Sequence, residues 1–137
     1  IFENPRTLKV AEISNDPPMN ILKGTKSSEK LNFENILIKS PSHFKNLSDQ
    51  SYNFGIRASE IKLDNQGEEF EIELAEISGS ETLLHLKKGE SNVIALIEEV
   101  MNFKIHEKVK IKFNENKLYA FDQNEELVSS PYGVSHG

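Results

Sequence analysis

Four histidines are the side chains best suited to acid–base chemistry, and they stand far apart along the chain: His43, His85, His106 and His136. A catalytic histidine needs a partner that positions it, and wide separation in sequence makes such a partnership among the four histidines unexpected. The absence of cysteine excludes thiol catalysis, thiolate metal sites and disulfide bonds. We therefore expect surface imidazoles and no catalytic residue in this chain.

Three alternating glutamates, Glu69, Glu71 and Glu73, are the strongest candidates for ligands of a hard cation. They would line one face of a strand, where neighbouring carboxylates on that face lie ~7 Å apart. This spacing forms no compact cage without ligands from elsewhere. We expect a solvated strand face, with no metal site and no cofactor-binding residue in this chain.

The sequence contains only incomplete fragments of nucleotide-binding motifs. Gly24-Thr25-Lys26-Ser27 lacks the first glycine and the spacing of the phosphate-binding loop, Gly-x-x-x-x-Gly-Lys-Ser/Thr. Leu47-Ser48-Asp49-Gln50 is superficially like another nucleotide-binding signature but lacks its glycines. We expect that this chain alone does not hydrolyse ATP.

Single-stranded nucleic acid is the alternative ligand that the residue types allow, since small β-barrels often bind it. Such binding needs aromatic rings for stacking beside a basic groove. With 16 Lys and Arg against 22 Asp and Glu, the net charge is −6, which disfavours nucleic acid and anionic membranes as partners. The candidate residues are the rings of Tyr52, Phe54, Tyr119 and Phe121 and the basic stripe of Lys108, Lys110 and Lys112.

A short helix is predicted at the start of the chain. Asn4 is a suitable cap, Pro5 suits a first turn, and apolar residues follow at near-helical spacing from Leu8 to Ile13. The segment Asn15-Asp16-Pro17-Pro18 ends this helix, because prolines cannot continue it.

Most of the remaining chain alternates between apolar and polar residues, as half-buried strands do. The apolar phase shifts after Leu74, which is typical of a bulge, and turns are predicted at Gly79-Ser80 and Lys88-Gly89. The run Val93–Val100 is apolar on both faces and is therefore predicted to be a central strand. The other predicted strands are Ile36–Ile38, Tyr52–Ile56, Phe70–Leu74, Thr82–Leu86, Val109–Phe113 and Leu118–Phe121, with a second helix start at Ser40-Pro41 that would bury Phe44 and Leu47. Short strands at this spacing favour a mostly β fold, a small barrel or sandwich.

A length of 137 residues suits a single domain. No apolar run approaches the ~18 residues of a spanning helix, and no secretory signal opens the sequence. Because the first residue is Ile1 rather than Met, we expect the chain to be cut from a longer protein.

Five short motifs follow one another in an order typical of one protein family. They are residues 1–11, Pro17-Pro18-Met19-Asn20, Phe54-Gly55-Ile56-Arg57-Ala58-Ser59-Glu60, Gly79-Ser80-Glu81-Thr82 and Leu118-Tyr119-Ala120-Phe121-Asp122. Together they resemble the C-terminal part of the ATP-binding subunits of ABC importers. The Pro-Pro-Met-Asn version is most similar to the carbohydrate-importing branch, the maltose-transporter ATPase type.

The resemblance implies an OB-fold-like domain of the TOBE type: a small barrel of short antiparallel strands with an N-terminal helix. It implies that residues 1–16 end a missing nucleotide-binding domain, that residues 17–128 form the regulatory domain and that residues 129–137 are a flexible tail. In the family this domain pairs two ATPase subunits and sometimes receives a regulatory protein or a small effector. The implied partners are therefore a second copy and transmembrane permease subunits. The full-length protein would use ATP and Mg²⁺ on the cytoplasmic face of the membrane.

The family motifs also single out residues with structural or regulatory roles: Gly55, Ile56, Arg57, Glu60, Gly79, Ser80, Glu81, Thr82, Phe121 and Asp122. We expect Gly55 and Gly79 where a Cβ would oppose the backbone geometry or a close approach. Arg57 and Glu60 would pair locally or across a contact. We also expect the apolar face of the opening helix to be uncovered in this chain. An OB-type oligonucleotide-binding domain stays open as the alternative, and a sugar-active enzyme ranks last because no acid–base pair is recognisable.

Overall fold

The computed structural model describes residues 5–13, 17–33 and 35–132, and its fold is mostly β. Strands make up 56% and helices 11%, which confirms the predicted class of antiparallel strands with a helix near the N-terminus. The chain divides into two compact units. The first unit comprises residues 1–56 and 115–137, and the inserted unit comprises residues 57–114.

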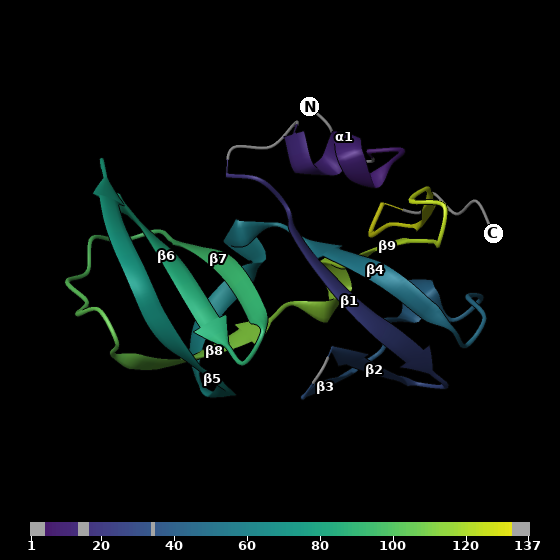
Figure 1. Ribbon diagram of the computed structural model, residues 1–137, viewed down its shortest axis with the longest axis horizontal. Helices are drawn as coiled ribbons and strands as arrows, with labels where there is room; N and C mark the ends of the chain where they lie inside the picture. The colour runs from purple at the N-terminus through teal and green to yellow at the C-terminus, as the bar shows by residue number, and fades with distance from the viewer. Residues whose placement is uncertain (1–4, 14–16, 34, 133–137) are drawn as a thin grey trace. The chain divides into compact units, whose positions relative to one another are not determined.

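The first unit is built on one antiparallel sheet with the strand order β10-β9-β4-β1-β2-β3 (Figure 1). Phe54 lies at its centre, with its ring centroid 5.2 Å from that of Phe33 and 5.7 Å from that of Phe44. All three rings are fully buried. The strands are β1 (Asn20–Ser27), β2 (Lys30–Phe33), β3 (Ile36–Lys39), β4 (Ser51–Ile56), β9 (Tyr119–Phe121) and β10 (Leu127–Ser129).

The helix α1 (Leu8–Ile13) packs against the first unit, so the expectation of an uncovered apolar face is wrong. Leu8 and Ala11 are buried in a cluster that includes Met19, Tyr119, Phe121 and Leu127. Two backbone hydrogen bonds hold the helix start there, from Leu8 N–H to the Glu125 carbonyl (2.9 Å) and from Leu127 N–H to the Arg6 carbonyl (2.8 Å). The predicted cap Asn4 and the residues Asn15 and Asp16 lie outside the described residues.

The predicted second helix is a single 3-10 turn, η1 (Ser42–Phe44), which buries Phe44 as expected. The neighbouring His43 joins this turn to the C-terminal strands. Its Nε2–H donates to the Leu118 carbonyl (2.7 Å), and its own carbonyl accepts from the Ser129 hydroxyl (2.8 Å). Ser129 and Ser130 are buried, so the chain is packed as far as Ser130.

The inserted unit contains the second antiparallel sheet, with the order β7-β6-β5-β8. Its strands are β5 (Ile61–Ser78), β6 (Glu81–Lys88), β7 (Ser91–Ile97) and β8 (Lys108–Phe113), preceded by the 3-10 turn η2 (Ala58–Glu60), whereas η3 (Glu115–Lys117) belongs to the first unit. The long strand β5 pairs with β8 in its first half and with β6 in its second half. The register shifts between Ile72 and Leu74, so β5 has a bulge, but it lies just before Leu74 and not after it as predicted.

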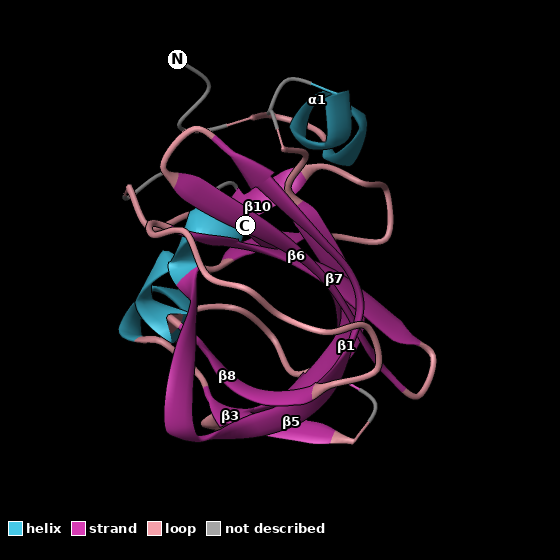
Figure 2. Cartoon of the chain, turned by 90° about the vertical axis from the view of Figure 1, so that its left-hand side faces the viewer, coloured by secondary structure: helices cyan, strands magenta, loops and turns pink. Residues whose placement is uncertain are grey.

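The strand β7 lies at the edge of its sheet, beside β6, and the prediction of a central strand is wrong (Figure 2). Its inward side chains, Val93, Ala95 and Ile97, are buried, whereas the outward Ile94 and Leu96 are partly exposed. β7 is apolar on both faces because its outward face is itself partly apolar, and not because the strand lies between two others.

Candidate functional site

The residues singled out by the family motifs lie in separate parts of the structure. Gly55, Ile56, Phe121 and Asp122 belong to the first unit, whereas Arg57, Glu60 and the Gly79–Thr82 turn belong to the inserted unit. Within each unit they form small local groups, and contacts of Gly55, Asp122, Thr82 and Glu60 can be described.

Gly55 lies where the sheet approaches α1 and its supporting side chains. A Cβ at this position would lie 2.6 Å from Met19 Sδ and 3.2 Å from Phe121 Cε1. Gly55 pairs with Ile21 on one side and Tyr119 on the other, so the backbone cannot easily move away. The absence of a side chain therefore lets the Met19 and Phe121 side chains cover the sheet.

Asp122 organises the turn between β9 and β10. Its Oδ1 accepts the N–H groups of Asn124 (2.8 Å) and Glu126 (3.0 Å). Within this turn Glu125 has φ +62°, a conformation that L residues other than Asn and Asp rarely adopt. The turn holds the Glu125 carbonyl that receives the first helical N–H of α1.

In the inserted unit, Thr82 and Glu60 each anchor a neighbouring segment. The fully buried Thr82 hydroxyl donates to the Glu99 carbonyl (2.8 Å) and accepts from Met101 N–H (3.0 Å). The Glu60 carboxylate accepts from Asn114 Nδ2 (3.1 Å), and the Asn114 N–H donates to the Glu60 carbonyl (3.0 Å). Gly79 has φ +62°, which suits the turn before Thr82.

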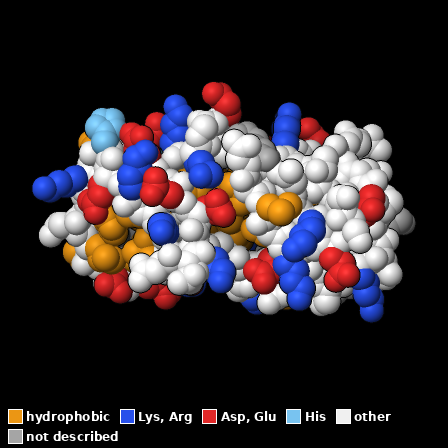
Figure 3. Space-filling model, turned by 90° about the horizontal axis from the view of Figure 1, so that it is seen from below, with side chains coloured by type: hydrophobic (Ala, Val, Ile, Leu, Met, Phe, Trp, Pro, Cys, Tyr) orange, Lys and Arg blue, Asp and Glu red, His pale blue; other side chains and the backbone are white. Residues whose placement is uncertain are grey.

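The rings proposed for nucleic-acid stacking are inaccessible, which contradicts their use as a platform. Tyr52 is 5% exposed, Tyr119 is 1% exposed, and Phe54 and Phe121 are fully buried. The three lysines of β8 are exposed, but Lys108 lies 3.6 Å from the Glu71 carboxylate. On the face drawn in Figure 3, basic and acidic side chains are interspersed and form no continuous basic stripe.

Two histidines of the inserted unit lie beside carboxylates on the sheet surface. His85 Nε2 is 2.8 Å from Glu76 Oε1, and His106 Nδ1 is 2.7 Å from Glu71 Oε2. The hydrogen bond from His106, aided by the charge of Lys108, lowers the pKa of Glu71. In the described part of the chain no three His, Asp or Glu side chains are grouped to hold a metal ion. His136 lies outside the described residues.

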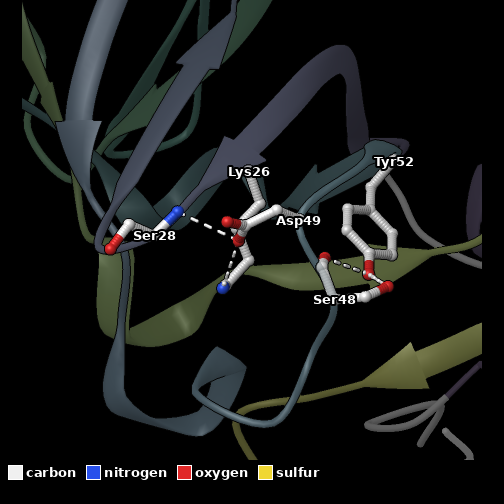
Figure 4. Close-up of polar contacts among 5 residues, drawn as sticks. All are labelled: Lys26, Ser28, Ser48, Asp49 and Tyr52. Atoms are coloured by element: carbon white, nitrogen blue, oxygen red, sulfur yellow. Dashed lines mark hydrogen bonds and ion pairs between the residues drawn. The ribbon is translucent and has the colours of Figure 1, made fainter.

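A buried lysine joins the two sequence fragments that resemble parts of nucleotide-binding motifs (Figure 4). Lys26 is 6% exposed and its Nζ lies 3.2 Å from Asp49 Oδ1, which also accepts Ser28 N–H (2.9 Å). The Ser28 N–H and the Lys26 ammonium lower the pKa of Asp49. Nearby, the Tyr52 hydroxyl donates to the Ser48 carbonyl (2.7 Å). The sequence analysis did not identify the Lys26–Asp49 pair, which connects the β1–β2 turn to the segment before β4.

An open groove of about 500 Å³ lies on the sheet face that carries α1. The register of β1 and β4 places Lys23 opposite Asn53 and Thr25 opposite Ser51 on its floor. Its walls include Leu8, Glu125 and Gln123, whose Nε2 donates to the Ser51 carbonyl (3.1 Å). The groove has the hydrogen-bonding groups and the size for a small polar ligand.

Comparisons with known proteins find similarity to import ATP-binding proteins. The sn-glycerol-3-phosphate import ATP-binding protein UgpC of Shigella sonnei (strain Ss046) is 26% identical over 128 residues, covering 89% of this chain. The same protein of Escherichia coli (strain K12) gives the same identity and coverage. No protein-family model matches the chain. Among the described residues, no helix is both long and apolar enough to span a membrane.

The chain spans 36% of the length of these relatives. The similar region is their C-terminal part. The chain is thus similar to the C-terminal part of import ATP-binding proteins, as the sequence motifs predict.

Proposed function

We propose that this chain is the regulatory and dimerisation domain of the ATP-binding subunit of an ABC importer for sugars or related polyols. The observation that carries this proposal is the similarity over 89% of the chain to the C-terminal part of UgpC proteins. In the longer protein, ATP and Mg²⁺ would be bound by the domain that precedes α1. The assembly would include transmembrane permease subunits and lie at the cytoplasmic face of the membrane.

The physical role of such a domain is to keep two ATPase domains near each other. ATP sites of this kind form between two subunits that open and close during each cycle. A pair of β domains that stays associated keeps the effective concentration of the ATPase domains high while they are open. The helix α1 would link the two parts, since its backbone bonds and its buried Leu8 and Ala11 fix it to the first unit.

The groove beside α1 is where we place a small regulatory ligand within this proposal. Lys23 can bind an anionic group, and Thr25, Ser51 and Asn53 can exchange hydrogen bonds with hydroxyls. Glycerol 3-phosphate is the first compound to test, because the relatives are named for its import. A specific ligand would raise the melting temperature in a concentration-dependent way. Lys23→Gln would abolish that rise without changing the melting temperature of the free chain.

The test of the proposed function is the mass of the chain in solution, measured by light scattering on a sizing column over a concentration series. We expect a species near twice 15.6 kDa. A single-chain mass at every concentration would contradict the pairing role. ATP hydrolysis by the purified chain would contradict its assignment as a part outside the catalytic domain.

A further inference from the structure

The outer face of the β5–β6–β7 sheet in the inserted unit has more apolar character than a solvated sheet face. On β6 the side chains of Thr82, Leu84 and Leu86 point inward and are buried, so Leu83 and His85 point outward. The register places Leu83 opposite Leu96 and His85 opposite Ile94. Leu74 of β5 stands opposite His85 on the other side and is 43% exposed.

These residues form an apolar band across three strands, which we call the outer band: Leu74, Leu83, Ile94 and Leu96. A sheet face that meets water normally carries polar side chains, whereas a strand that is apolar on both faces is typical of a sheet covered on both sides. Contiguous exposed apolar surface commonly marks an interaction site. The outer band therefore points to a covering partner.

Charged residues lie at opposite ends of this face and differ in sign. Toward the end of β6, Lys87 stands opposite Asn92 and Glu71, and Lys108 lies 3.6 Å from that same Glu71. Toward the start of β6, Glu81 stands opposite Ser78, and Glu98 follows the end of β7. At one end Lys87 and Lys108 outnumber Glu71, which makes this end basic, and Glu81 and Glu98 make the other end acidic. Between the two ends lie the apolar residues of the outer band together with one polar pair, in which His85 Nε2 is 2.8 Å from Glu76 Oε1.

We propose that the outer band binds the same face of a second copy of this chain, with β6 of the two copies running antiparallel. Lys87 and Glu81 lie three residues to either side of Leu84 on β6. A twofold axis through the middle of the face therefore brings the basic end of each copy over the acidic end of the other. The two apolar bands meet at the axis, where Leu83 and His85 lie.

The arrangement of charge favours a second copy over an unrelated partner. An isologous interface requires a surface that is complementary to itself after a twofold rotation. The opposite signs at equal distances from Leu84 meet this requirement, and like charges would face each other in the parallel arrangement. This inference rests on the proposed pairing role and assigns that role to one face.

The test compares dimer dissociation constants by sedimentation velocity on the whole chain. We expect Lys87→Glu and Glu81→Lys each to weaken the dimer at least tenfold, because each places like charges together. The double variant K87E/E81K reverses both ends and should restore the dimer to within threefold of the original. Leu74→Asp should also weaken the dimer, whereas the matched control Leu37→Asp, at a 60% exposed side chain of the first unit, should not.

The outcomes separate this inference from the proposed function. If Lys87→Glu, Glu81→Lys and Leu74→Asp all leave the dissociation constant of the dimer unchanged, the pairing role stands and the assignment to this face is overturned. A double variant as weak as the single variants overturns the antiparallel arrangement. An unmodified chain that is monomeric at every concentration overturns both proposals. Circular dichroism of each variant separates loss of pairing from loss of fold.

Discussion

At the scale of single residues, the buried Thr82 hydroxyl is the clearest example of a side chain that replaces missing backbone pairing. It satisfies the Glu99 carbonyl and the Met101 N–H, which belong to the segment that follows β7. Because the side chain is fully buried, water does not replace the hydroxyl when it is removed. This explains in physical terms why the Gly79–Thr82 motif carries a threonine.

We expect Thr82→Val to lower the free energy of unfolding by about 1–3 kcal/mol, the cost of leaving buried polar groups without a partner. Urea unfolding measures this loss. Thr82→Ser keeps the hydroxyl and is the matched control, for which we expect a smaller loss. Hydrogen exchange at the Met101 amide should accelerate in the valine variant and not in the serine variant. Equal losses in both variants would show that the methyl group contributes as much as the hydroxyl and would contradict this account.

The Lys26–Asp49 pair gives a prediction about pH. The pKa of Asp49 is lowered in the folded chain by the Ser28 N–H and by Lys26, so the carboxylate form is favoured by folding. Its stabilising contribution is therefore present above the ordinary aspartate pKa of about 4 and is lost as the pH falls through the lowered value. Thermal unfolding between pH 7 and pH 3 measures this dependence.

Asp49→Asn removes the titrating group, so we expect its melting temperature to fall less steeply between pH 5 and pH 3 than that of the original chain. At pH 7 the variant should be the less stable of the two, because the ammonium of Lys26 is buried and loses its carboxylate. Parallel curves over the whole pH range would contradict this account.

At the scale of elements, the helix α1 is stabilised by its docking and not by its length. A helix of six residues has little stability in isolation. Its stability comes from Leu8 and Ala11 in the buried cluster and from two backbone bonds to the β9–β10 turn and to β10. The helix therefore reports on the packing of the first unit.

We expect Leu8→Ala to destabilise the first unit by about 2 kcal/mol, at the low end for a buried leucine because the site lies at the edge of the core. The matched control is Leu37→Ala, at an exposed leucine of the same unit, with an expected change within about 0.5 kcal/mol. Chemical denaturation followed by circular dichroism measures both. A loss at Leu8 no larger than that at Leu37 would mean that α1 is not docked in solution.

Most elements could be predicted from the sequence because their alternation matches one buried face. The strands ending at Ile56 and Phe113 are examples, and a bulge in β5 could be predicted to within two residues of its position. The place of β7 could not be predicted, because an apolar pattern on both faces is the same for a central strand and for an edge strand with a second contact surface. The pair Lys26–Asp49 also gave no signal, since its members are 23 residues apart and meet only through the register of β1 and β4.

At the scale of the whole molecule, the chain consists of a continuous unit inserted into a discontinuous one. The chain leaves the first unit after β4 and returns before β9, and these strands are neighbours, with Gly55 opposite Tyr119. The ends of the inserted unit are likewise joined, by the pairing of Ile61 with Phe113 and by the two bonds between Glu60 and Asn114. Each unit therefore closes on itself.

This closure predicts that residues 57–114 fold without the rest of the chain. The unit has its own core, in which the Phe70 and Phe113 rings lie 6.3 Å apart and Ile72, Leu84 and Ile111 are fully buried. Domains of about 60 residues can fold alone, although their stability is small. We expect dispersed amide resonances and a cooperative thermal transition for the isolated segment. Phe70→Ala is the control and should abolish both, because it removes one of the two phenylalanine rings of that core.

The same geometry gives a prediction for the complementary fragment, which is the chain without residues 57–114. Because β4 and β9 are adjacent, a short glycine linker can replace residues 57–114 and leave the sheet of the first unit intact. If the proposed interface on the outer band is correct, residues 57–114 alone should dimerise and the complementary fragment should be monomeric. A folded but monomeric inserted unit, together with a dimeric first unit, would move the pairing surface from the outer band to the first unit.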